Sequence, residues 1–399
     1  MICVIIPKYD KGVKMLTAYK FRLYPTQEQE EFFFQCFGAK RFIWNKALDL
    51  CKTRLYNGDY VPSFFELNKM LTLWKKADEW SFLRDAPKDI MQITLDDLSK
   101  AFGAMFKGQR REPRFKKKYD TYQSFTVIAS AWVKDNVVKI PKLKEPVKFR
   151  RSQRVKGKVK RVTVSFDGFQ WFVSILADAA DVIKPSKGKT CGLDIGVKRL
   201  ATLSDGTFVS PIHFTKDIQK LEKHQRSMSR KIKGSARWSK AKSRVQKAYR
   251  RISNRRKDYL HKASTAIADE YSTIFIEDLN IKNMSKSAKG TADLPGKNVA
   301  QKRGLNKAIL SQGWYMFFEM LSYKTEQRGG KVLKVDPKFT SQICSNCGYK
   351  SKENRESQSM FKCKKCGNTQ NADHNAAKNI YARGLRVNAQ GKGSYNELD

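Results

Sequence analysis

Three acidic residues in the second half of the chain stand in sequence settings from which they could bind divalent metal. Asp194 lies in Cys-Gly-Leu-Asp-Ile-Gly, Glu277 in Ile-Phe-Ile-Glu-Asp-Leu-Asn, and Asp373 in Asn-Ala-Asp-His-Asn-Ala-Ala. Carboxylates gathered at one point repel one another unless cations are present. Two divalent ions about 3.5 to 4 Å apart would activate water and stabilise the leaving oxygen of a phosphodiester. The three residues therefore indicate a hydrolytic metal site.

Each of these carboxylates also has a purely structural explanation. Asp194 could occupy a turn or bulge, Glu277 could be an exposed strand end, and Asp373 could cap a helix. The order of the elements favours a shared site instead. Asp194 lies in the middle of a predicted strand, and Glu277 ends a strand expected to run parallel beside it. Asp373 opens a helix that would pack across both strands, so we expect the three side chains to converge.

A second group of residues has the spacing of a zinc ribbon. Cys344 and Cys347 are separated by two residues, fifteen residues follow, and Cys363 and Cys366 repeat the pair. Four thiolates at this spacing hold one Zn²⁺ tetrahedrally and leave no position for a catalytic water. Redox disulfides are the alternative interpretation. We expect a structural zinc ion in an element that supports the fold or contacts nucleic acid.

The charge of the chain indicates a polyanionic partner. Among 399 residues, 80 are Lys or Arg and 38 are Asp or Glu, which gives a formal net charge of +42. A field of this size exceeds what solubility requires and attracts nucleic acid. A basic surface that is merely solvated is the alternative, but the charge is grouped in runs that are interleaved with aromatic residues.

Three basic segments supply the candidate nucleic-acid contacts. The first is a loop around Pro113, the second lies at 148–161, and the third is one face of two long helices between 215 and 270. For the helices, a purely structural hairpin is the alternative. Because Lys and Arg neutralise phosphates, we expect backbone contacts from these segments. The candidates are Lys107, Arg110, Arg111, Arg114, Lys116, Lys117, Arg150, Arg151, Arg154, Arg237, Lys240, Arg244, Arg251, Arg255 and Arg256.

The sequence contains no candidate membrane segment. No stretch reaches the roughly 18 apolar residues of a membrane span, and the first residues lack the basic region of a signal peptide. The other four cysteines are scattered singly in hydrophobic surroundings, which is typical of free thiols in a reducing compartment. We expect a cytoplasmic protein, associated with the nucleoid in a prokaryote, that has no membrane partner and favours the monomeric state.

The first half of the chain predicts a β-rich unit with inserted helices. Residues 15–24 alternate in the manner of a half-buried strand, and β-branched and aromatic residues return in short runs between 121 and 180. Between them, apolar residues at three and four spacing predict helices from Pro25 to about Leu48, over 64–75 and over 88–106. We expect a small β-barrel or sheet that the first strand joins.

The second half of the chain predicts an α/β domain of the RNase H-like kind. Antiparallel strands followed by alternating helices and strands are the element order of that architecture. The expected elements are strands at 190–197, 199–203 and 207–210, helices at 215–232 and 236–270, a strand at 273–277, a helix at about 311–328, a strand at 331–335 and, after the cysteines, a helix at 373–384.

The motifs together resemble those of the TnpB family, the transposon-encoded RNA-guided nucleases related to type V CRISPR effectors. The resemblance extends over nearly the whole chain, and the combination of motifs is far more specific than any single one. Gly192–Gly196, Ile276–Leu279 and Asp373–Ala377 resemble the three RuvC motifs. The other similar segments are Tyr19–Thr26 and Gly38–Asn45 in the N-terminal signature, Pro113–Lys117 in the basic connector, and Thr340–Gly348 at the start of the zinc-ribbon insert.

The resemblance implies a multidomain α+β protein. Its RuvC-like, RNase H-like nuclease domain would carry a zinc-ribbon insert and would follow a wedge-like β-barrel into which a helical recognition lobe is inserted. The implied boundaries are 1–24 and 119–184 for the barrel, 25–118 for the lobe, 185–339 and 371–399 for the nuclease domain, and 340–370 for the ribbon.

The resemblance also implies an RNA-guided DNA endonuclease. Asp194, Glu277 and Asp373 would ligate two Mg²⁺ ions, or Mn²⁺ in their place, and the four ribbon cysteines one Zn²⁺. A guide RNA would pair with double-stranded target DNA after a short adjacent motif is read, and one DNA strand would be displaced. The intact triad argues against the nuclease-dead relatives of the family.

Two other hypotheses fit the same residues. An RNase H-like DNA transposase uses a similar acidic triad for strand transfer, and joined products in a reaction with transposon ends would favour it. A non-cleaving RNA-guided DNA-binding regulator predicts that Asp194→Ala leaves function unchanged. The guide RNA, the adjacent DNA motif and the cleavage pattern have no signature in the sequence.

Overall fold

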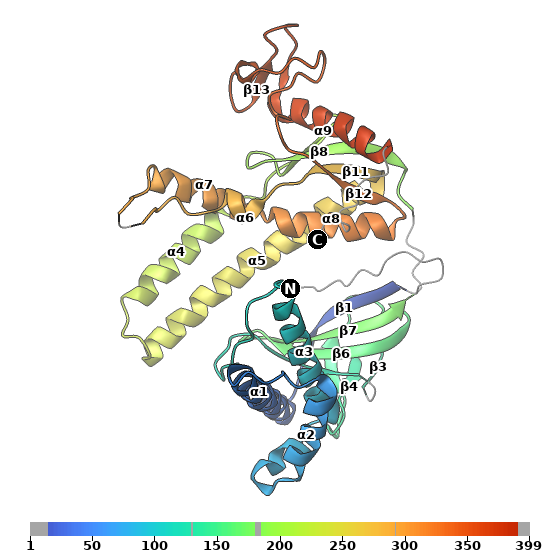
Figure 1. The fold of residues 1–399 in the computed structure, drawn as a ribbon, viewed down its shortest axis with the longest axis vertical. Helices are drawn as coiled ribbons and strands as arrows, with labels where there is room; N and C mark the ends of the chain where they lie inside the picture. Colours follow the sequence, from blue (N-terminus) through green and yellow to red (C-terminus); the bar gives the residue numbers. More distant parts are fainter. Residues whose placement is uncertain (1–14, 129–130, 180–184, 292, 390–399) are drawn as a thin grey trace. The chain divides into compact units, whose positions relative to one another are not determined.

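The computed structural model describes residues 15–128, 131–179, 185–291 and 293–389 (Figure 1). Backbone contacts divide the chain into two compact units, Met1–Val182 and Ile183–Asp399. Each unit has its own sheet and its own hydrophobic cores, and each is described by itself.

The first unit is built on a seven-stranded antiparallel sheet, ordered β2-β6-β7-β1-β5-β4-β3. The first described strand lies inside the sheet, because it pairs with β7 on one side and β5 on the other. Among the described residues, β2 and β3 lie at the two edges, and closure into a barrel stays a prediction. The strands are β1 (Met15–Tyr24), β2 (Gln123–Val127), β3 (Trp132–Lys134), β4 (Val137–Lys139), β5 (Val147–Arg150), β6 (Lys158–Phe166) and β7 (Trp171–Ala179).

Helices between β1 and β2 supply a second core. The apolar stripes of these helices meet one another, and Ile43, Leu67 and Leu98 are fully buried between them. The observed bounds agree with the predicted ones, except that the first helix continues beyond Leu48. The helices are α1 (Gln27–Tyr56), α2 (Phe64–Lys76), the short η1 (Asp78–Arg84) and α3 (Lys88–Phe106).

The second unit contains a five-stranded mixed sheet, ordered β10-β9-β8-β11-β12. Strand β8 runs antiparallel to β9 and parallel to β11, and β11 is parallel to β12. This arrangement of antiparallel strands followed by parallel ones agrees with the predicted element order. The strands are β8 (Lys189–Ile195), β9 (Ala201–Leu203), β10 (Phe208–Val209), β11 (Tyr271–Glu277) and β12 (Lys331–Val335).

The two faces of this sheet carry different cores. Cys191, Leu193 and Ile274 face α5 (Ala236–Glu270) and α8 (Trp314–Gln327), whose apolar side chains complete one cluster. Because side chains alternate along a strand, Phe275 and Leu333 face the other way, toward α9 (Ala372–Ala389). Figure 1 shows α8 and α9 on opposite sides of the sheet.

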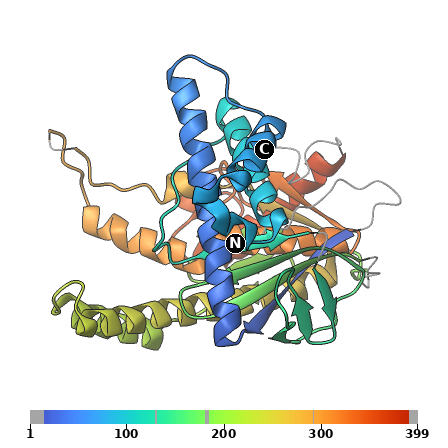
Figure 2. The ribbon, with the colours of Figure 1, turned by 90° about the horizontal axis from the view of Figure 1, so that it is seen from below.

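Helices α4 (Thr215–Ser229) and α5 run side by side as an antiparallel hairpin (Figure 1 and Figure 2). The turn between them contains Gly234, whose φ of +92° is in the left-handed region that favours glycine. Val245 and Ile252 of α5 pack against Phe214 and Leu221. The apolar stripe of the hairpin therefore faces inward.

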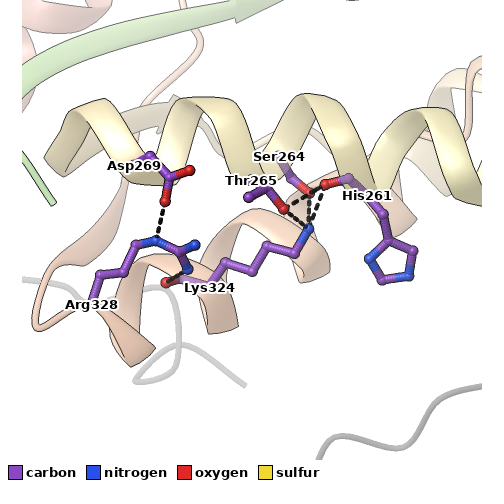
Figure 3. A network of polar contacts seen from close by, with 6 residues as sticks. All are labelled: His261, Ser264, Thr265, Asp269, Lys324 and Arg328. Atoms are coloured by element: carbon purple, nitrogen blue, oxygen red, sulfur yellow. Dashed lines mark hydrogen bonds and ion pairs between the residues drawn. The ribbon is translucent and has the colours of Figure 1, made fainter. Parts of the chain in front are cut away.

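A buried polar network joins α5 to α8 (Figure 3). The Lys324 Nζ donates hydrogen bonds to the His261 carbonyl oxygen at 2.6 Å, to Ser264 Oγ at 2.8 Å and to Thr265 Oγ1 at 2.7 Å. Three acceptors match the three donors of an ammonium group. Burial nevertheless lowers the pKa of Lys324 to about 8. This contact fixes one helix against the other beneath the sheet.

The helix predicted at about 311–328 corresponds to α8, and the structure contains one more helix directly before it that was not predicted. α7 (Val299–Gln312) ends and α8 begins at Gly313. The backbone of Gly313 has a φ of +74°, which breaks the helix and favours glycine. α7 buries only Ile309 and Gln312, so its residues form no continuous apolar stripe that would predict the helix.

The cysteine segment between β12 and α9 contains only short elements: η2 (Lys352–Asn354), β13 (Met360–Lys362) and β14 (Thr369–Asn371). β13 and β14 pair antiparallel. A further short helix, α6 (Ile281–Met284), follows β11. In the described part of the chain, no helix combines the length and the apolar character needed to cross a membrane.

Candidate active site

Asp194 lies on the face of the sheet that α9 covers. Side chains alternate along β8, so Asp194 and Gly192 share this face. A Cβ atom at position 192 would lie 2.4 Å from both the Ala377 carbonyl oxygen and the Tyr381 amide nitrogen. Only glycine lets the backbone of α9 lie directly on β8, and this contact fixes the helix two residues from Asp194.

A second close contact fixes α9 nearer its end. A Cβ atom at Gly384 would lie 1.9 Å from the Phe275 ring, so the helix also lies directly on β11. With both contacts made, the N-terminus of α9 lies at the carboxyl ends of β8 and β11, where Glu277 ends its strand. Asp373 belongs to the first turn of α9, where the helix dipole favours a carboxylate.

The three predicted acids line one cavity of about 440 Å³. Asp194 comes from β8, Glu277 from the end of β11, and Asp373 from α9. All three side chains are half-buried. The oxygens of the three acids do not all lie within 4.8 Å of one another. Among the described residues, only the four cysteines discussed below form so tight a group of possible metal ligands. The fold thus brings the three acids of the sequence analysis to one site as a loose cluster.

The electrostatics of the cavity favour cation binding. Burial, and then the charges of Glu277 and Asp373, hold the pKa of Asp194 well above its usual range, while Arg355 acts in the opposite direction. Burial also raises the pKa of Glu277. Neighbouring carboxylates disfavour one another's ionised form unless a positive charge compensates them. The donor set therefore fits divalent ions, whose binding would release protons and strengthen as the pH rises.

Thr340 holds Glu277 in place, although the sequence analysis did not assign it a role in the site. The Thr340 hydroxyl donates a hydrogen bond of 2.5 Å to Glu277 Oε1. Its own carbonyl oxygen accepts a 2.8 Å hydrogen bond from Asn379 Nδ2, and the same amide group donates to the Ile343 carbonyl oxygen at 2.7 Å. Asn379 is a buried polar residue of α9. Helix α9 therefore positions Glu277 through Thr340.

Arg355 is a second residue that the sequence analysis missed. It comes from the cysteine segment, lines the cavity, and places its Nη2 3.9 Å from Asp373 Oδ1. A cation at this position can compensate negative charge in the cavity. The only signal in the sequence is a basic residue between two cysteine pairs, which does not distinguish Arg355 from its many basic neighbours.

The four predicted zinc ligands form one cluster. Sγ atoms of Cys344 and Cys366 lie 3.7 Å apart, and those of Cys347 and Cys363 3.6 Å apart. All four ligand atoms lie within 4.8 Å of one another. Tetrahedral thiolates around Zn²⁺ at about 2.3 Å would be separated by about 3.8 Å. The cluster can therefore hold one metal ion of this size.

Three family models match parts of the chain. Residues 15–59 match "Helix-turn-helix domain" (HTH_OrfB_IS605), residues 176–288 match "Probable transposase" (OrfB_IS605), and residues 314–380 match "Cas12f1-like, TNB domain". InsQ of Escherichia coli (strain K12), named as a candidate RNA-guided DNA endonuclease, is 42% identical over 95% of this chain and 95% of its own length. The chain belongs to the TnpB family.

Two further comparisons extend this result. A relative from Streptomyces pristinaespiralis, also named as a candidate RNA-guided DNA endonuclease, is 35% identical over 94% of this chain and 91% of its own length. A solved Cas12f1–sgRNA–target DNA complex matches with a TM-score of 0.54 at 15% identity, over 89% of this chain and 83% of that one. At this identity the likeness establishes the fold alone, a mixed α/β fold of the Cas12 kind.

In this TnpB family member, the segment matched as helix-turn-helix contains no pair of helices. Residues 15–59 form the strand β1 and the single 30-residue helix α1. Tyr19, Phe21 and Leu23 of β1 are buried against Phe33 and Phe37 of α1. The apolar residues of this segment therefore build a strand and a helix of one core.

The basic loop around Pro113 is held firmly on α1. Trp44 Nε1 donates to the Arg114 carbonyl oxygen at 2.9 Å. The Asn45 side-chain amide donates to the Lys116 carbonyl oxygen and accepts from the Lys116 backbone N–H. The Lys116 Nζ lies 3.9 Å from the centroid of the Trp44 ring, and burial lowers its pKa to about 8. Lys116 is thus half-buried, whereas the other candidates of this unit are exposed: Lys107, Arg110, Arg111, Arg114, Lys117, Arg150, Arg151 and Arg154.

The candidates on α5 divide into two groups. Arg237, Lys240 and Arg244, near the hairpin turn, are exposed. Arg251 and Arg255 instead pair with the buried Asp217, the first through a 3.0 Å contact. The last candidate, Arg256, is half-buried and lies over the Phe214 ring, 5.4 Å from its centroid. The structure therefore gives the last three of these residues partners within the hairpin, while Arg251 and Arg255 stay exposed.

Proposed function

We propose that the chain is an RNA-guided DNA endonuclease that hydrolyses phosphodiester bonds at the cavity lined by Asp194, Glu277 and Asp373. The observation that carries the proposal is the convergence of three half-buried carboxylates, from three separate elements, in a chain with a net charge of +42. The relatives named as candidate RNA-guided DNA endonucleases support the same activity. The finer assignments of metal, domain and partner below are part of this proposal.

Two Mg²⁺ or Mn²⁺ ions are the cofactors that this donor set suits. When bound, such ions supply a nucleophilic water and stabilise charge on the leaving oxygen. Asp194 and Asp373 present ligand oxygens from a rigid strand and from the first turn of a helix. Glu277 is oriented by the Thr340 hydroxyl. Arg355 faces the same cavity and would stabilise negative charge on the scissile phosphate.

The domain assignment follows from the same site. We assign 185–339 and 371–399 to a RuvC-like nuclease domain and 340–370 to a zinc ribbon inserted before α9. The ribbon would hold Zn²⁺ through Cys344, Cys347, Cys363 and Cys366, whose spacing in the structure suits that ion. We assign 1–24 and 119–184 to a wedge-like barrel and 25–118 to a helical recognition lobe.

Guide RNA and target DNA are the proposed partners. Base pairing between them would select the sequence, and the exposed basic residues would hold backbones without reading bases. Salt dependence tests this division. Each phosphate contact that is lost should reduce the slope of log affinity against log salt concentration by about 0.7 to 0.9. Arg114→Ala and Arg244→Ala should reduce it, whereas Arg255→Ala, which removes a partner of Asp217, should mainly lower stability.

The decisive experiment begins with the RNA. The protein is purified from cells that carry its flanking locus, the bound RNA is sequenced, and DNA that matches it is supplied with Mg²⁺. We expect cleavage that disappears after RNase treatment, after chelation and in Asp194→Ala, while Asp194→Ala still binds the target. Purification without any RNA, together with cleavage that RNase leaves unchanged, would overturn the guided mechanism.

The family description "Probable transposase" keeps one other function open to test. A transposase would use a DNA 3′-hydroxyl group in place of water at the same acidic site. The products distinguish the two reactions, because strand transfer joins transposon ends to target DNA whereas hydrolysis leaves free ends. We expect only free ends. Joined molecules in a reaction with labelled transposon ends would favour the transposase.

A further inference from the structure

One row of side chains runs from the acidic cavity to the edge of the sheet. Asp194 on β8 pairs with Thr202 on β9, and Thr202 pairs with Phe208 on the edge strand β10. Side chains of directly paired residues lie on the same face of a sheet. Phe208 therefore shares the face of Asp194. Two strand spacings, about 10 Å, separate the backbones of these two residues.

Phe208 contributes little to the core. Its side chain is 53% exposed, whereas Thr202 beside it is buried. The next residue, Val209, points to the other face and packs with the core beneath the sheet. A single exposed aromatic residue is ordinary on a protein surface. What distinguishes Phe208 is the side chain that covers it.

Arg199 lies over the Phe208 ring, with its Cζ 4.2 Å from the ring centroid. Arg199 and the neighbouring Lys198 also line the acidic cavity. Within the described ranges, neither cation has a carboxylate partner. The turn that carries them is tight, because a Cβ atom at Gly196 would lie 3.1 Å from the Arg199 carbonyl oxygen. A guanidinium group and an aromatic ring are thus held together at the rim of the cavity.

We propose that Arg199 and Phe208 form a stacking platform for the nucleobase next to the phosphodiester in the cavity. Unpaired bases stack on aromatic rings and on guanidinium planes. A base inside a duplex has no free face, so the platform takes single-stranded DNA. Every base has a π-face, so it takes that strand without base preference. The proposal rests on the proposed function, which assigns the scissile phosphodiester to this cavity.

Fluorescence of 2-aminopurine tests binding to the platform. The probe is placed at successive positions of the displaced strand of a target matched to the bound RNA, and the protein carries Asp194→Ala so that the DNA stays intact. We expect stacking to quench the probe at one position. Phe208→Ala should restore the fluorescence at that position, and Phe208→Trp should keep it quenched. The proposal would be overturned if, at every probe position, Phe208→Ala quenched the fluorescence as strongly as the protein that keeps Phe208.

Cleavage kinetics supply the second readout. Phe208→Ala should raise KM for the strand about 5- to 150-fold, which corresponds to the 1 to 3 kcal/mol of one stacked base. With the wild-type protein, an abasic nucleotide at the quenched position should raise KM by the same factor as the Phe208→Ala substitution does. With Phe208→Ala, the abasic nucleotide should raise KM no further. The control is Tyr315→Ala, which removes a 66% exposed aromatic residue from α8 of the same unit and should leave KM unchanged.

The outcomes separate this proposal from the proposed function. Quenching that depends on Phe208 without any metal-dependent cleavage would support the platform and refute the endonuclease. RNA-guided cleavage with a KM that Phe208→Ala does not change would agree with the endonuclease proposal and would refute the stacking platform. The stacking platform would also be refuted if the abasic nucleotide raised KM by the same factor in the wild type and in Phe208→Ala.

Discussion

Replacing Gly192 by alanine tests whether the direct contact of α9 with β8 builds the acidic cavity. The new Cβ atom would lie 2.4 Å from the Ala377 carbonyl oxygen and the Tyr381 amide nitrogen, and ordinary van der Waals contact begins at 3.4 Å. The helix must therefore shift by about 3.4 − 2.4 = 1.0 Å. Both contacting atoms belong to the backbone, so no side chain can rotate away to make room.

The shift should reach the chemistry because α9 carries Asp373. A displacement of about 1 Å between reacting groups can cost on the order of 100-fold in rate. An extra methyl group in a well-packed core costs about 1 to 3 kcal/mol of stability. We expect Gly192→Ala to lower the melting temperature of the second unit and to reduce the rate of guided cleavage by about two orders of magnitude, with RNA binding unchanged.

Two quantities are measured for the wild type and for each variant. One is the initial rate of cleavage of matched DNA in Mg²⁺, and the other is the melting temperature, followed by circular dichroism. The control is Gly304→Ala in α7 of the same unit, where a Cβ atom would meet nothing within 4 Å. This change should leave cleavage unchanged and add up to about 1 kcal/mol of helix stability. Wild-type melting and wild-type cleavage in Gly192→Ala would refute the reasoning, because they would mean that α9 does not rest on β8.

Three other perturbations follow from the polar contacts. The raised pKa of Asp194 means that its ionised form destabilises the metal-free fold, and this cost appears as pH rises through that pKa. Asp194→Asn should therefore raise the melting temperature by a few degrees at neutral pH in the presence of a chelator. This gain in melting temperature should vanish in acid. Thr340→Val removes the hydrogen bond to Glu277, so the acidic limb of the pH–rate profile should move to higher pH; an unchanged limb would exclude this contact as the cause. Because burial lowers the pKa of Lys324 to about 8, the unfolded chain holds more protons above that pH, and stability should rise by up to about 1.4 kcal/mol per pH unit between pH 8 and 10; Lys324→Met should abolish this slope in thermal melts.

Local patterns in the sequence were sufficient to predict most elements of the fold. The alternation of residues 15–24 and the three and four spacing over 88–106 match β1 and α3 at both ends. Such patterns are local because each element must bury one face or stripe. Helix α7 escaped prediction, because it buries only Ile309 and Gln312 and therefore has no continuous apolar stripe.

Sequence alone also determined which side chains could do chemistry. The spacing of Cys344, Cys347, Cys363 and Cys366 fixes a metal cluster locally, because two short turns present the four thiolates to one point. The types and settings of Asp194, Glu277 and Asp373 pointed to a shared site before their convergence in one cavity was known.

Only the tertiary structure decided how these side chains are held and what surrounds them. The hydrogen bond from Thr340 to Glu277, the approach of Arg355 to Asp373 and the row from Asp194 to Phe208 depend on strand register and on the path of α9. Register and helix path result from the packing of segments far apart in the chain. No local pattern of residue types carries that information, and a shift of one residue in a strand would turn Asp194 away from the cavity.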